Sequence, residues 1–311
     1  MPFPLIQQRR FLFVTGKGGV GKTTVCAAMA TALAAAGRRV LVAACGAEER
    51  LSAVLETRPI GGDVVEVRPN LFAVFITPKE AMSQYGAMVL KSRLAYAPLF
   101  ENRYVTNFFD AVPGLREWAV LGRSWYLATE TRGDGRFRFD TVLLDAPATG
   151  HALDMLAVPR VIMAVAPKGV LRRDAERAWT MLQDPAQSGV IVVTLPEELP
   201  VSETLELTTK LTESFGLPIA GLVVNSCAAP IFSESEANFL AGRSDLLAPS
   251  MTLSLVELSA RLAVRERVQA QNLERLNALD HPKVILPRQG QPGAEGELVE
   301  VLSRHFSSGA S

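Results

Sequence analysis

Short, continuous runs of apolar residues recur along the chain, separated by longer stretches in which apolar residues follow a helical spacing. Runs of this length are typical of strands that are covered on both faces in a parallel sheet. They lie at residues 11–14, 39–44, 141–144, 190–193, 219–224 and 283–286, and residues 64–67 and 71–76 indicate a strand pair or two edge pieces. Helices are expected over residues 25–36, 47–56, 153–182, 202–215 (with Ser202 as N-cap), 233–241, 256–279 and 297–306.

This alternation of strands and helices decides the expected fold class. Strand–helix–strand units connect with right-handed crossovers, so their repetition builds one mostly parallel, doubly wound α/β sheet. In such a sheet the ligand site lies at the carboxyl ends of the strands. We expect residues 1–311 to form a single domain of this class, with a disordered tail at residues 307–311.

Two segments depart from the alternation. Residues 78–131 carry many large apolar residues at helical intervals, punctuated by Pro98 and by Pro113-Gly114, and predict an all-helical insertion. A shorter helical segment is expected at about residues 151–183. Both would form a helical layer on the sheet.

Composition narrows the class of protein. The 311 residues are 48% apolar and 21% charged, and 32 basic residues balance 32 acidic ones, so no net field favours nucleic acid as a partner. The apolar run at 153–166 is broken by charged residues and a proline, and the N-terminus lacks an apolar signal core, so we expect a cytoplasmic protein without stable membrane insertion. Three cysteines without a C-x-x-C pair fit a reducing compartment.

A glycine-rich turn joins the first strand to the first long helix. Gly16, four further residues and Gly21-Lys22-Thr23 reproduce the P-loop spacing, in which backbone N–H groups surround phosphates. Lys22 then reaches the β- and γ-phosphates, and the Thr23 hydroxyl is a ligand of Mg²⁺. The sequence therefore predicts a nucleotide site formed by Gly16, Lys17, Gly18, Gly19, Val20, Gly21, Lys22, Thr23 and Thr24.

A second lysine, Lys17, lies inside the loop and gives it the sequence GKGGVGKT. This sequence resembles the deviant P-loop of a family that includes partitioning ATPases, the nitrogenase iron protein, and the arsenite-efflux and tail-anchored-protein targeting ATPases. The resemblance implies an obligate dimer that binds ATP or ADP with Mg²⁺. Within it, Lys17 would be catalytic and reach the nucleotide of the partner subunit, as an arginine finger does elsewhere. A solvated loop lysine is the alternative.

The strand at residues 141–144 brings Asp145 to the P-loop edge of the sheet. A carboxylate in this place holds Mg²⁺, generally through water. The run D-A-P-A-T-G-H-A-L that begins at Asp145 resembles the second switch of the arsenite-efflux and tail-anchored-protein targeting ATPases. The resemblance assigns the switch to Asp145, Pro147, Thr149, Gly150 and His151, although His151 could simply belong to a helix start.

The resemblance extends over most of residues 11–290, including residues 194–204 and 223–225. It implies that Asn225 binds the adenine edge and that Pro287 and Arg288 cover the base. Asparagine at a strand end is also a common turn former, which is the alternative for Asn225.

In the targeting ATPases, helices beside both switches form a methionine-rich groove for a membrane helix. The comparable helices here contain Met82, Met88, Met155, Met163 and Met181, whose flexible side chains suit varied apolar partners. An ordinary helical core packed on the sheet is the alternative.

Cys45 departs from the family pattern, since relatives usually carry an aspartate there, in the first switch, to position the attacking water. A thiol with an ordinary pKa near 8.5 is neutral and cannot replace that carboxylate, so Glu48 or Glu49 would have to move in. We expect an ATP-dependent molecular switch whose hydrolysis is weak or absent in this chain alone. It would be a homodimer or a heterodimer that acts on an unidentified protein client.

The alternative is a non-hydrolysing pseudo-ATPase, a scaffold or regulatory subunit that pairs with an active homologue. Cys26, Cys45 and Cys227 provide neither the paired cysteines of a zinc-clamped dimer nor the converging thiols of an arsenite site. The sequence therefore disfavours an arsenic pump.

Overall fold

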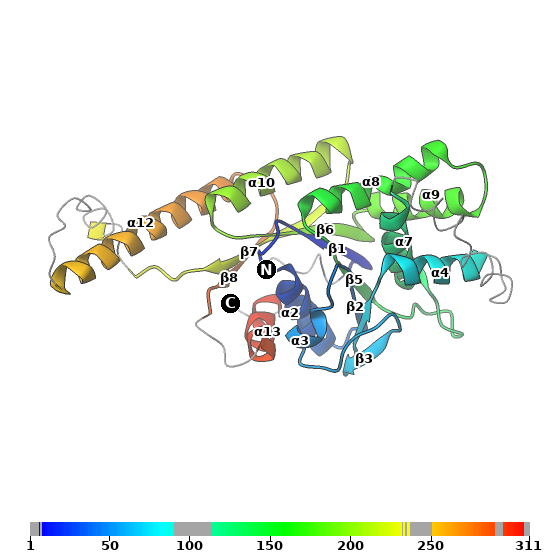
Figure 1. Ribbon diagram of the computed structural model, residues 1–311, viewed down its shortest axis with the longest axis horizontal. Helices are drawn as coiled ribbons and strands as arrows, with labels where there is room; N and C mark the ends of the chain where they lie inside the picture. Colours follow the sequence, from blue (N-terminus) through cyan, green and yellow to red (C-terminus); the bar gives the residue numbers. More distant parts are fainter. Residues whose placement is uncertain are drawn as a thin grey trace.

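The computed structural model describes residues 6, 8–89, 114–231, 233, 235–236, 251–289 and 295–307. In these ranges the strands form one sheet in the order β3-β4-β2-β5-β1-β6-β7-β8 (Figure 1). Every neighbouring pair is parallel except β3 and β4, which confirms the expected mostly parallel sheet. The strands are β1 (Phe11–Thr15), β2 (Val40–Ala44), β3 (Val65–Arg68), β4 (Leu71–Phe75), β5 (Thr141–Asp145), β6 (Ser188–Thr194), β7 (Ile219–Cys227) and β8 (Lys283–Pro287).

Helices cover both faces of the sheet, because successive side chains of each strand point to opposite sides. Leu12 and Val14 pack with α2, α3 and α13 in one apolar cluster, whereas Phe11 and Phe13 pack with α7, α8, α9 and α10 in another. The helices are α2 (Lys22–Ala35), α3 (Leu51–Val54), α4 (Pro78–Val89), α7 (Leu115–Thr129), α8 (Thr149–Val165), α9 (Val170–Gln183), α10 (Glu198–Thr209), α12 (Met251–Asn277) and α13 (Glu295–Ser303), with a π-helical turn at Lys210–Ser214 and a 3-10 turn at Arg304–Phe306.

The expected insertion at 78–131 is helical in its described part, which contains α4 and α7. Residues 90–113 of that insertion lie outside the described residues, as do most of the expected helix at 233–241 and residues 308–311 of the expected tail. Met155 and Met181 are only 3% and 6% exposed, and Met82 and Met163 pack partly buried in the same helical layer. The side chain of Met88 lies outside the described residues. None of the described helices is both long and apolar enough to cross a membrane.

Three expected boundaries are wrong. Only Leu51–Val54 of the expected helix 47–56 is helical, whereas the mostly helical segment expected at 153–182 is confirmed as α8 and α9, with Pro167 and Gly169 between them. Ser202 is not an N-cap, since α10 begins at Glu198 and tolerates Pro200 in its first turn, where the missing N–H leaves no helical bond unmade. β7 also continues past Asn225 to Cys227.

Candidate nucleotide site

The P-loop lies where β1 meets α2, at the carboxyl edge of the sheet. A Cβ on Gly16 would lie 2.0 Å from the carbonyl oxygen of Val193, and a Cβ on Gly21 would lie 2.5 Å from Nδ2 of Asn225. Both glycines also have positive φ, 151° and 87°, a region in which side chains cause strain. The loop is a cradle that only glycine permits, and the N-terminus of α2 behind it favours an anion.

The two loop lysines have different partners. Lys22 Nζ donates to the carbonyl oxygens of Gly16 and Lys17 at 3.1 Å each, so its side chain lies folded over the loop. Burial lowers the pKa of Lys22, and the charge of Asp145 raises it. Lys17 instead reaches α10, where its Nζ lies 2.5 Å from Oε1 of Glu203.

The ion pair between Lys17 and Glu203 lies near the surface, with 33% and 42% of the two side chains exposed. Sequence reasoning singled out the segment around Glu203 by its family likeness but did not predict this contact. The available signal was an acidic residue on the helix that follows β6, the strand beside β1.

Asp145 stands at the end of β5, between β1 and β2 in the sheet. Its Oδ2 accepts the hydroxyl of Thr23 at 2.6 Å, and its Oδ1 has no hydrogen-bond partner among the described residues. The residue is 6% exposed, and this burial raises the pKa of its carboxyl to about 6, although the Thr23 hydrogen bond and the charge of Lys22 lower it. An unpaired, buried carboxylate oxygen beside a hydroxyl is the kind of oxygen pair that a hydrated Mg²⁺ accepts.

Cys45 follows β2 and lies against the backbone of the same aspartate. Its Sγ–H donates to the carbonyl oxygen of Asp145 at 3.4 Å. Burial, with the charge of Asp145, raises the pKa of the thiol to about 12, so it stays neutral at physiological pH. The Glu49 carboxylate has another partner, because it accepts the N–H and the hydroxyl of Ser52 in α3.

Among the described residues, cavities lie on both sides of the P-loop. The phosphate-side cavity, of about 410 Å³, is lined by Lys22, Thr23, residues 44–48, Arg50, Leu51, Phe75 and residues 145–148. The base-side cavity, of about 380 Å³, is lined by residues 19–21, 195–198, Asn225, Ser226, Ala228, Arg265, Val268, Gln269 and Arg288. The fold therefore gathers Lys22, Thr23, Cys45, Asp145 and Pro147 around one cavity, and residues 19–21 of the loop with Asn225 and Arg288 around the other.

The base-side cavity contains groups that sequence reasoning missed. Asn225 Nδ2 donates to the carbonyl oxygen of Val20 at 2.9 Å and so ties β7 to the loop. Gln269 of α12 binds both backbone groups of Ala228, at 2.9 and 2.8 Å, and fixes the next turn of chain. Pro287 lies in β8 and does not border this cavity. Nothing in the local sequence of α12 predicted that this helix would line the base-side cavity.

The residues assigned to the second switch lie in two different environments, one before and one after the start of α8. Pro147 borders the phosphate-side cavity, and Thr149 begins the helix with a buried Oγ1 that has no partner among the described residues. Gly150 and His151 are exposed on the first turn of α8 and border neither cavity.

Comparison with known proteins agrees with this geometry. A family model described as anion-transporting ATPase, ArsA, matches residues 9–173, about half of the chain. ATPase BagA of Mycobacterium tuberculosis is 26% identical over 312 aligned residues, which cover 94% of this chain and 91% of that relative. The arsenical pump-driving ATPase of Escherichia coli is 26% identical over 283 residues, covering 80% of this chain but 48% of the pump-driving protein. The chain belongs to the anion-transporting ATPase (ArsA) family of ATP-binding P-loop proteins.

Proposed function

We propose that this chain binds Mg-ATP as a dimer and acts as a nucleotide-dependent switch, with weak or no hydrolysis when it acts alone. The phosphates would lie in the cradle that a Cβ on Gly16 or Gly21 would fill, with Lys22 against them. The base would occupy the cavity beside Asn225 and Arg288. These features support the proposal because each one fits a part of the nucleotide.

Thr23 and Asp145 would hold the magnesium ion. Bound there, Mg²⁺ would neutralise phosphate charge and orient the terminal phosphates. The unpaired Oδ1 of Asp145 supports this assignment, because a buried carboxylate oxygen without a partner is costly unless a ligand satisfies it.

The observation that carries the weak-hydrolysis part of the proposal is the environment of Cys45. A water that attacks the γ-phosphate needs an acceptor for its proton, and a thiol whose pKa is about 12 is a poor one beside a carboxylate. Glu49 accepts the N–H and the hydroxyl of Ser52, so this nearby carboxylate has another partner.

The ion pair between Lys17 and Glu203 bears on the dimer. Lys17 would serve the nucleotide of the partner subunit, so it must first leave Glu203. A pair this close to the surface is weak enough to be exchanged for a phosphate. In the nucleotide-free chain, Lys17 would therefore stay paired with Glu203 until a partner subunit and ATP are both present.

Turnover of the purified chain and two variants tests the proposal. The wild-type protein should bind ATP but release phosphate slowly, and Cys45→Asp should raise kcat at least tenfold, because it restores the missing acceptor. Cys45→Ser, of similar size but neutral, is the matched control and should stay slow. Wild-type turnover equal to that of Cys45→Asp would refute the role given to Cys45.

A second candidate is a non-hydrolysing subunit that pairs with an active homologue. It is favoured by the combination of a neutral Cys45 with an intact Lys17, since such a chain could still complete the partner's site. Turnover that appears only on mixing with a co-purifying homologue, and that Lys17→Ala abolishes, would select this candidate. Turnover that is the same with and without the homologue would exclude it.

A further inference from the structure

The phosphate-side cavity is bordered by a cation that belongs neither to the P-loop nor to the second switch. The charged side chains among the described residues that line this cavity are Lys22, Glu48, Arg50 and Asp145. Lys22 is bonded to the loop carbonyls and Asp145 to Thr23, so both belong to the phosphate and magnesium site already described. Arg50 and Glu48 come from the segment that follows β2.

Arg50 has a partner that it can readily exchange. Its Nη2 lies 3.4 Å from Oε2 of Glu48, and 76% of each side chain is exposed. Exposed pairs with this geometry are weak, because solvent screens the charges. A phosphate would bind Arg50 more strongly than Glu48 does, since the planar guanidinium can bind two phosphate oxygens at once.

The backbone at Arg50 is held in place although its side chain is exposed. Its carbonyl oxygen accepts the N–H of Val54 at 3.2 Å, at the start of α3. The next residue, Leu51, is fully buried in the core. Glu49 accepts the N–H of Ser52 in the same helix, so Arg50 stands on a fixed turn beside the cavity.

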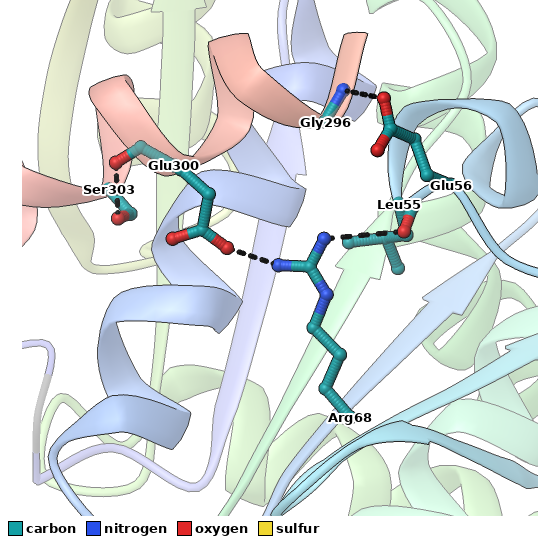
Figure 2. Close-up of polar contacts among 6 residues, drawn as sticks. All are labelled: Leu55, Glu56, Arg68, Gly296, Glu300 and Ser303. Carbon is teal, nitrogen blue, oxygen red and sulfur yellow. Dashed lines mark hydrogen bonds and ion pairs between the residues drawn. The ribbon is translucent and has the colours of Figure 1, made fainter. Parts of the chain in front are cut away.

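The far end of this segment is fastened to the C-terminal helix, as Figure 2 shows. Glu56 accepts the N–H of Gly296 at 3.1 Å, at the start of α13. Arg68 donates to the carbonyl oxygen of Leu55 at 3.3 Å and pairs with Glu300 of α13. Recognition of a ligand by Arg50 therefore needs a rotation of its side chain and no rearrangement of α3.

We propose that Arg50 recognises the γ-phosphate and makes the chain bind ATP more tightly than ADP. When ATP fills the P-loop, the guanidinium leaves Glu48 and binds γ-phosphate oxygens across the phosphate-side cavity. The cavity, at about 410 Å³, has room for about a dozen waters at ~30 Å³ each, enough for a phosphoryl group and a hydrated Mg²⁺. Glu49 is bonded to Ser52, so this carboxylate does not compete with the phosphate for Arg50.

This inference rests on the proposed nucleotide switch and names the group by which the first switch would tell ATP from ADP. A switch that hydrolyses slowly still depends on that difference, because a ligand shifts an equilibrium only through differential affinity for its states. ADP lacks the phosphate that Arg50 would bind, so Arg50 contributes to the affinity for ATP alone.

Equilibrium titration with fluorescent MANT derivatives of AMPPNP and ADP, in the presence of Mg²⁺, tests the inference without turnover. Arg50→Ala should weaken MANT-AMPPNP binding about tenfold and leave MANT-ADP binding within twofold, as expected for loss of one charge-assisted phosphate contact. Glu48→Gln should tighten MANT-AMPPNP binding, because it removes the competing carboxylate. Arg58→Ala, at an exposed position that borders neither cavity, is the matched control and should change neither affinity.

The outcomes separate this inference from the proposed function. Unchanged MANT-AMPPNP affinity in Arg50→Ala, or an equal loss of both nucleotides, would overturn the assignment of Arg50. A Glu48→Gln protein with weaker MANT-AMPPNP binding would contradict the exchange of partners. Wild-type protein that binds neither nucleotide would instead refute the nucleotide switch itself.

Discussion

The buried carboxylate of Asp145 should make the nucleotide-free protein less stable at neutral pH. Its pKa is raised from 3.8 to about 6 by burial, so the folded chain binds this proton more tightly than the unfolded chain does. The ionised Asp145 carboxylate therefore lowers the free energy of unfolding above about pH 6, and this loss becomes smaller as the pH falls toward 4. At ~1.4 kcal/mol per pKa unit, Asp145→Asn should raise the free energy of unfolding by about 3 kcal/mol at pH 8 and by about half of that at pH 5.

Urea unfolding without nucleotide and with EDTA, at pH 8 and at pH 5, measures this difference. Asparagine keeps an oxygen that can accept the Thr23 hydroxyl, so the change removes mainly the buried charge. Asp154→Asn, at an exposed position of α8, is the matched control and should change stability by less than ~0.5 kcal/mol at either pH. A less stable Asp145→Asn protein, or a gain that does not shrink at pH 5, would refute the reasoning. The stabilised variant should also lose magnesium-dependent ATP binding, as expected where function retains an unfavourable group.

Three further predictions concern the same site. Gly16→Ala should abolish MANT-ATP binding and lower the melting temperature, because its Cβ would collide with the carbonyl oxygen of Val193; a variant that binds like wild type would contradict the cradle. Glu203→Gln should change stability by no more than ~1 kcal/mol yet favour the ATP-bound dimer in analytical ultracentrifugation, because Lys17 loses its competing partner; weaker dimerisation would speak against this view. Asn225→Ala should weaken MANT-ATP binding about tenfold, since it removes the tie to Val20 together with the proposed base contact, and an unchanged Kd would show that Asn225 only forms the turn.

The strands and the P-loop could be predicted because their signals are local. A strand buried on both faces must be a short apolar run, and the run at 39–44 corresponds to β2 at Val40–Ala44. The glycines of the P-loop are fixed by the backbone itself, as the positive φ of Gly21 shows. Asp145 could be placed beside the loop because parallel strands bring their carboxyl ends to one edge.

Contacts between distant segments could not be predicted in this way. Lys17 and Glu203 are 186 positions apart, and nothing in either neighbourhood names the other. Arg50 and Arg265 reach their cavities only through the packing of α3 and α12. The start of α10 was predicted wrongly for a different reason. Pro200 is tolerated in the first turn of a helix, so α10 begins at Glu198, before this proline.

The place of β1 in the sheet has a consequence for synthesis of the chain. Its two neighbours, β5 and β6, begin at Thr141 and Ser188, so residues 16–140 leave the ribosome before the first of them is made. At a translation rate of about 5–20 residues per second, the apolar strand β1 stays without its pairing partners for roughly 6–35 s. The nascent N-terminal segment must therefore be shielded from aggregation for that time, and β1 cannot take its central place in the sheet before β5 and β6 have been translated.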